Sequence, residues 1–166
     1  MASAIGVALT SKLLLAFRSN IHWDEFYFLS MVHDYARGDL ATGLQTFHVH
    51  LFSWLPWLDG EVSQVIAARM VMAALAASSA LAIYGIARRF ASRGGALFAV
   101  LGSLALSVVV EHGASFRTDP VATFLVLVAL CCMIRRPGSV AAAILAGAAL
   151  AVAALVTIKI AFFLPL

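Results

Sequence analysis

Long apolar runs alternate with short polar segments along this chain. The five longest runs contain few charges, and they approach the roughly 20 residues that a helix needs to cross a bilayer. They lie at residues 2–17, 65–87, 94–110, 120–134 and 140–158, and a further apolar stretch, "AFFLPL", follows them. The pattern predicts an all-α fold, a polytopic membrane helical bundle of about five spans plus the start of a sixth.

Residues 18–64 form the longest stretch without a spanning pattern. Within it, residues 25–37 place apolar side chains three and four positions apart, which predicts an amphipathic helix that stops at Gly38. The patch "FHVHLFSWLPWL" predicts a second interfacial element. We therefore expect residues 1–166 to form a single transmembrane domain, with residues 18–64 as an outer loop that contains interfacial helices.

The composition supports membrane insertion. Apolar residues make up 63% of the chain and charged residues 11%, whereas a soluble domain has about a quarter of its residues charged. The neighbouring Cys131 and Cys132 lie inside an apolar run, where packing is expected rather than a disulfide or a metal site.

The distribution of charge predicts the orientation. Five arginines fall in two loops that contain no acidic residue, and such loops are typically cytoplasmic. These arginines are Arg88, Arg89, Arg93, Arg135 and Arg136. The N-terminus is then cytoplasmic, and all eight acidic residues, all five histidines and all three tryptophans face the outer side. We therefore expect an integral multi-pass protein with its active site on the outer face.

The acidic residues of the outer loops have two readings. Asp24 and Glu25 lie at the start of a predicted helix, where the helix dipole favours carboxylates. They could therefore either cap the helix or have a functional role. Asp119 and Pro120 are typical of an N-cap and a first helical residue. Capping does not explain Arg117, which predicts an ion pair or an anionic ligand.

The outer cations and histidines add weaker signals. Arg69 and Lys159 lie near the outer ends of their runs, where each could extend its charge towards the headgroups. His48 and His50 would share one side of an extended strand but not of a helix, and this spacing alone is a weak metal signal.

Several short motifs resemble a known family. An acidic pair follows the first span, "RGDL" precedes the stretch rich in His, aromatic residues and Pro, "R-x-D" opens the fourth span and "T-x-K" closes the fifth. The chain resembles the N-terminal part of GT-C-fold membrane glycosyltransferases of the protein O-mannosyltransferase and aminoarabinose transferase type. The resemblance implies transfer of a sugar from a polyprenyl-phosphate donor to a lipid, glycan or protein acceptor, with no nucleic-acid partner.

The resemblance also implies residue roles. Asp24 would be the catalytic acid-base residue with Glu25 beside it, and Asp119 would be the second-loop acid. Arg117 and Lys159 would contact the donor phosphate, and His48 and His50 would be further substrate-binding candidates. Asp24 and Asp119 would be the ligands of a divalent cation, Mg²⁺ or Mn²⁺, where one is used. Family members have more spans, so we expect this chain to be the truncated N-terminal portion of such a module, with doubtful activity alone.

Two other classes remain open. A transporter or channel-type protein could use the outer acidic residues and histidines as an ion site. Relay residues are expected near the midplane of spans, however, and there only Lys12 is charged. A non-catalytic membrane scaffold would use the Ala/Gly-rich helix faces for packing, but so would an enzyme.

Overall fold

The fold is entirely helical in the part of the chain that the computed structural model describes, residues 1–41, 43 and 46–162, apart from the side chains of residues 108 and 111. The elements are α1 (Ala2–Arg18), α2 (Trp23–Arg37), α3 (His48–Leu51), η1 (Leu55–Trp57), α4 (Glu61–Ala87), α5 (Arg93–Ala105), α6 (Ser107–His112), α7 (Thr118–Arg135), α8 (Val140–Val156) and η2 (Ile158–Phe162). Most of the predicted sixth span, residues 163–166, lies outside the described residues.

Within the described residues, two helices, α4 and α7, are long and apolar enough to cross a membrane. A third candidate span exists if α1 and α2, which are bent by 69° at the break between them, count as one broken span. The apolar helices α5 and α8 have only 13 and 17 residues. The described part of the chain is therefore all-helical with two or three candidate spans, and a bundle of about five spans is not confirmed.

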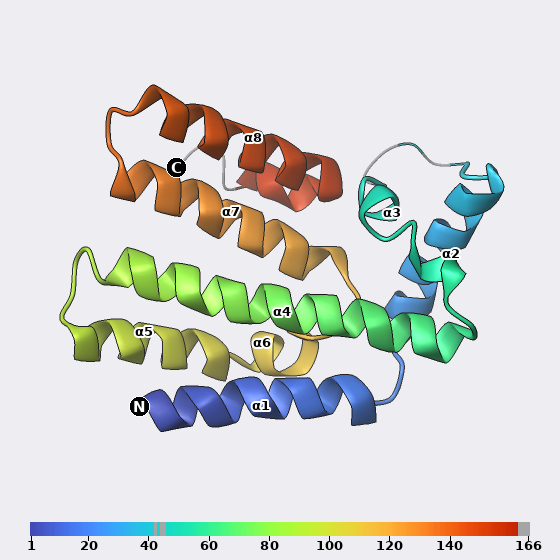
Figure 1. Ribbon diagram of the computed structural model, residues 1–166, viewed down its shortest axis with the longest axis horizontal. Helices are drawn as coiled ribbons and strands as arrows, with labels where there is room; N and C mark the ends of the chain where they lie inside the picture. The colour runs from blue at the N-terminus through green and yellow to red at the C-terminus, as the bar shows by residue number, and fades with distance from the viewer. Residues whose placement is uncertain (42, 44–45, 163–166) are drawn as a thin grey trace.

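Helices α1, α5, α4, α7 and α8 lie roughly side by side, with α4 at the centre (Figure 1). The segments α2, α3 and η1 gather at one end of this bundle (Figure 1). Helix α2 follows the predicted range closely and ends at Gly38, whose positive φ of 79° gives the left-handed stop that glycine permits.

The run at residues 94–110 is not one helix. Leu106 has extended backbone angles, φ −60° and ψ 132°, so α5 ends there and the short helix α6 begins. Three successive valines follow, and their branched side chains lower helix propensity, which weakens any preference for a continuous helix at this point.

The two arginine-rich turns meet at the end of the bundle opposite α2. The turn after α4 contacts the end of α7, where Arg89 Nη2 donates to the backbone oxygen of Arg135 at 3.0 Å. The N-terminus of α1 lies at the same end (Figure 1). The basic turns therefore share one end, as the charge distribution requires of loops on a single side of a membrane.

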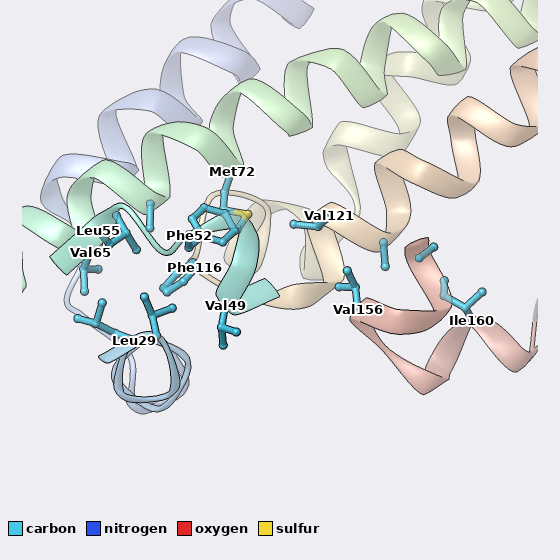
Figure 2. Close-up of a cluster of buried hydrophobic side chains, with 14 residues drawn as sticks. Leu29, Val49, Phe52, Leu55, Val65, Met72, Phe116, Val121, Val156 and Ile160 are labelled. Atoms are coloured by element: carbon cyan, nitrogen blue, oxygen red, sulfur yellow. The ribbon is translucent and has the colours of Figure 1, made fainter. Parts of the chain in front are cut away.

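The main hydrophobic core lies at the other end, where α2, α3, η1 and α4 pack with the start of α7, the end of α8 and η2 (Figure 2). Phe116, which precedes α7 and is 1% exposed, packs into this core with its ring 4.9 Å from that of Phe52. Because Phe116 is anchored there, the adjoining Arg117 is held next to α2.

The shared end of the basic turns predicts a labelling pattern for single cysteines in the full-length protein with Cys131 and Cys132 replaced by alanine. Ala91→Cys and Pro137→Cys should react with an impermeant maleimide from the same side of a sealed vesicle, and Asp59→Cys from the other side. Labelling of positions 91 and 137 from opposite sides would contradict this arrangement.

Candidate functional site

Four charged side chains from three segments form a continuous series of ion pairs. Arg117 Nη1 lies 2.5 Å from Asp24 Oδ2, and its Nε lies 3.5 Å from Asp119 Oδ2. The other oxygen of Asp119, Oδ1, accepts from Lys159 Nζ at 2.7 Å. The structure thus brings together Asp24 of α2, Arg117 and Asp119 at the start of α7, and Lys159 of η2.

Local backbone geometry positions these groups. Arg117 is extended, with φ −141° and ψ 162°, and immediately precedes α7, which begins at Thr118. The expectation that Asp119 caps the helix is therefore wrong, because Asp119 lies inside the first turn. There, as in the first turn of α2, the helix dipole stabilises an ionised carboxylate.

The ion-pair chain is partly open to solvent. The side chain of Arg117 is 24% exposed, those of Asp24 and Asp119 are each 40% exposed, and that of Lys159 is 62% exposed. Exposed ion pairs of this kind contribute little to stability and exchange partners readily. The cluster can therefore accept an incoming charged ligand without disturbing the fold.

A cavity of about 440 Å³ adjoins the cluster, between α4, α6, α7 and η2. Arg117, Asp119 and Lys159 line it together with Ser79 of α4 and Thr123 of α7. Asp24 contacts the cluster through Arg117 and is not among the lining residues. The volume is within the usual range for small-molecule sites, so a polar headgroup or sugar can be accommodated beside the charges.

Glu25, next to Asp24, has a different environment. It is 0% exposed, and its carboxylate accepts four hydrogen bonds, from Arg69 Nε (2.8 Å), Arg69 Nη2 (2.6 Å) and the backbone N–H groups of Phe116 and His22 (both 2.9 Å). Burial by itself raises the pKa of the Glu25 carboxyl, but the Arg69 guanidinium and the two N–H donors outweigh it and hold this pKa below its ordinary value.

These contacts give Glu25 a positioning role. A buried carboxylate that is fully hydrogen-bonded cannot reach a substrate proton, so the expectation of a catalytic role for Glu25 beside Asp24 is not favoured. Arg69 likewise does not extend towards the headgroups. It is 3% exposed, and its remaining N–H groups donate to the backbone oxygens of Ala16, Ser19 and Asn20. Sequence reasoning missed this pair because nothing in the spacing of residues 25 and 69 indicates contact.

His48 and His50, the two predicted substrate-binding histidines, lie in α3 and do not line the cavity. Because this segment is helical, their side chains point in different directions. His48 is buried with its ring 5.2 Å from that of Phe28, and His50 is exposed with its ring 4.7 Å from that of Tyr35. The structure therefore places His48 and His50 with the aromatic residues of α2 and not beside Asp119.

The expected metal ligands, Asp24 and Asp119, are not well arranged to bind a divalent cation. Among the described residues, no group of three or more His, Cys, Asp or Glu side chains is placed to hold a metal ion. Asp24 and Asp119 are both paired with Arg117, so a cation shared by the two carboxylates would have to displace the guanidinium. Cys131 and Cys132 are half-buried free thiols in α7.

Comparison with models of protein families, with characterised proteins and with solved structures finds no match to this chain.

The burial of the Glu25–Arg69 pair predicts how much each neighbouring acid contributes to stability. Glu25→Gln leaves the Arg69 charge buried without a counter-ion and should lower the free energy of unfolding by about 3–5 kcal/mol. Asp24→Asn, the matched control at the adjoining exposed position, should cost less than about 1 kcal/mol. Denaturation of the full-length protein in detergent measures both. Equal effects of the two substitutions would contradict the structural role of Glu25.

Proposed function

We propose that this chain carries the catalytic loops of a membrane glycosyltransferase, which moves a sugar from a polyprenyl-phosphate donor to an acceptor hydroxyl on the outer membrane face. One observation carries the proposal: Asp24, Arg117, Asp119 and Lys159 converge from distant segments beside a cavity of about 440 Å³. The resemblance to GT-C-fold enzymes would place the acids and cations of that family at the same four positions.

The cations suit the leaving group. Cleavage of the bond between the anomeric carbon and the phosphate oxygen leaves negative charge on the polyprenyl phosphate. Arg117 offers a planar guanidinium that can bind two phosphate oxygens, and Lys159 adds a second positive charge at the cavity wall. In the structure both cations are held by carboxylates, so a phosphate would enter by replacing those carboxylates.

That replacement links donor binding to base activation. When Arg117 turns to a phosphate, the Asp24 carboxylate is released from its ion pair and can contact the acceptor hydroxyl. Asp24 then removes the proton from the acceptor hydroxyl as its oxygen bonds to the anomeric carbon. The products are the glycosylated acceptor, polyprenyl phosphate and one proton on Asp24, which passes to solvent. Asp119, released from Lys159 by the same replacement, orients the acceptor.

The proposed topology follows from the charges. The turns with Arg88, Arg89, Arg135 and Arg136 would be cytoplasmic together with the N-terminus. The outer loop of residues 18–64 and the ion-pair cluster would then face outward. Helices α1, α4, α7 and α8, with α5 and α6 as a broken fifth unit, would form the spans of the bundle.

The proposal predicts that Asp24→Asn and Asp119→Asn lower sugar transfer by at least 100-fold, because general base catalysis typically contributes 10²–10⁴-fold. The assay uses the full-length protein in liposomes and a panel of polyprenyl-phosphate hexoses and pentoses, and follows the release of polyprenyl phosphate. Asp59→Asn, an exposed acid at the same end of the bundle, is the control and should transfer at the wild-type rate. Wild-type turnover in both site variants would refute the assignment.

The same liposomes test the alternative class. If the acidic residues formed an ion relay, their neutralisation would lower proton or cation flux across the membrane. We expect no difference in flux between the wild type and the two variants.

The poor fit of the donor set to a metal predicts the effect of chelation. Because Arg117 and Lys159 would neutralise the leaving phosphate, transfer in excess EDTA should stay within about twofold of the untreated rate. Arg117→Met should lower transfer by at least 100-fold, since loss of one group that stabilises the developing charge costs about 10²–10³-fold. Loss of transfer in EDTA that Mg²⁺ or Mn²⁺ restores would show that a metal takes this role.

A further inference from the structure

A second cavity, of about 560 Å³, lies between α1, the segment that follows it and the region of α6. Several of its lining residues are polar, among them Ser19, Asn20, His22, Ser107 and Ser115. Lys12 lines it as well, from the interior of α1. None of these residues lines the cavity beside Asp119.

Lys12 is a buried cation with few partners. It is 5% exposed, and its Nζ donates to the backbone oxygen of Val109. An ammonium group has three N–H donors, and no described acidic side chain forms an ion pair with Lys12. A buried positive charge is costly unless an anion and further acceptors compensate it.

Arg69, the other buried cation in this region, provides the contrast. Its two bonds to Glu25 and three to backbone oxygens use every N–H group of the guanidinium. Arg69 is therefore fully compensated by the protein itself, whereas Lys12 borders a polar cavity with hydrogen-bonding capacity left.

Gly113 separates the two cavities. A Cβ atom at this position would lie 2.9 Å from Lys12 Nζ, so the absence of a side chain leaves room for the ammonium group. Gly113 also lines the cavity beside Asp119, on the other side of α6. The two cavities are thus distinct: Lys12 lines one, and Arg117 and Lys159 line the other.

The surroundings of the second cavity are apolar. Leu15 and Val110 line it and are 43% and 48% exposed, and Leu106, next to the lining residue Ser107, is 56% exposed. Lys12 lies six residues from Arg18 at the end of α1, about 9 Å of helix. An anion that reaches Lys12 across such a rim is most simply one attached to an acyl chain.

We propose that this cavity binds the phosphate group of a membrane lipid, with Lys12 as its counter-ion and the hydroxyls of Ser107 and Ser115 as further donors. Phosphate oxygens accept several hydrogen bonds at once, which suits an ammonium group flanked by hydroxyls. This site goes beyond the proposed sugar transfer and does not depend on it.

Lipid binding to the full-length protein in detergent tests the proposal, with dioleoyl phosphatidic acid as the probe and dioleoyl phosphatidylcholine as the reference lipid. All measurements use an Arg117→Met background, so that the cluster beside Asp119 does not contribute. Native mass spectrometry should show phosphatidic acid bound in preference to phosphatidylcholine. Lys12→Met should weaken its binding at least tenfold, the order expected for one lost charge-assisted hydrogen bond.

Arg18→Met is the matched control, because Arg18 is an exposed cation of the same helix. It should bind phosphatidic acid within twofold of the background protein. An equal loss in Arg18→Met and Lys12→Met would show general attraction to the basic surface and overturn the site, as would unchanged binding in Lys12→Met. Inorganic phosphate that competes as strongly as phosphatidic acid would overturn the lipid assignment.

Folding of the variants is checked independently. Because Lys12→Met removes a buried positive charge that no described acidic side chain pairs with, its thermal stability without lipid should equal or exceed that of the background protein. If it does not fold, Ala114→Leu fills the same cavity with Lys12 retained and should also lose phosphatidic acid. Retained binding in that variant would refute the site. Sugar transfer is not measured in this experiment. A negative lipid-binding result would therefore leave the proposed glycosyltransferase function unaffected, and loss of that proposed function would leave the lipid site unaffected.

Discussion

The buried ion pair between Glu25 and Arg69 fixes the part of the structure on which the candidate site depends. Arg69 of α4 binds the backbone at the end of α1 and the carboxylate of α2, and that carboxylate binds the N–H group of Phe116. Asp24 immediately precedes Glu25 in the sequence, and Arg117 immediately follows Phe116. Because the inner partners are locked together, their outer neighbours meet as the ion pair between Asp24 and Arg117.

The buried Glu25–Arg69 pair forms an inner layer of charge, and the ion pairs of Asp24, Arg117, Asp119 and Lys159 form an outer layer. The two layers differ in how freely their members can change partners. The inner layer is closed to water and fully hydrogen-bonded, so any rearrangement would leave a buried charge uncompensated. The outer layer is partly solvated, and its carboxylates and cations can exchange partners at little cost. A rigid inner layer beneath an adaptable outer layer is the arrangement that a site for charged ligands requires, because the scaffold keeps its shape while the contacts change.

Much of the helical pattern could be predicted from the sequence, but the two layers could not. Apolar periodicity and Gly38 located α2, and the basic turns indicated which ends of the helices lie together. Whether Asp24 or Glu25 faces the interior depends on the rotation of α2 against α4, because successive helical residues point about 100° apart. Arg69 belongs to an apolar run, and its role follows from carbonyl groups that only the folded chain brings near it.

The break at Leu106 was also beyond prediction, and both cavities depend on it. Residues 94–110 have the composition of one uninterrupted span, yet the chain forms α5 and then the short helix α6. Helix α6 supplies Ser107 and Val110 to the cavity of Lys12, and Val109 and His112 to the cavity of Asp119. Departures from local sequence preference tend to concentrate where function requires an irregular backbone. The place where the helical pattern fails is thus the wall between the two candidate sites.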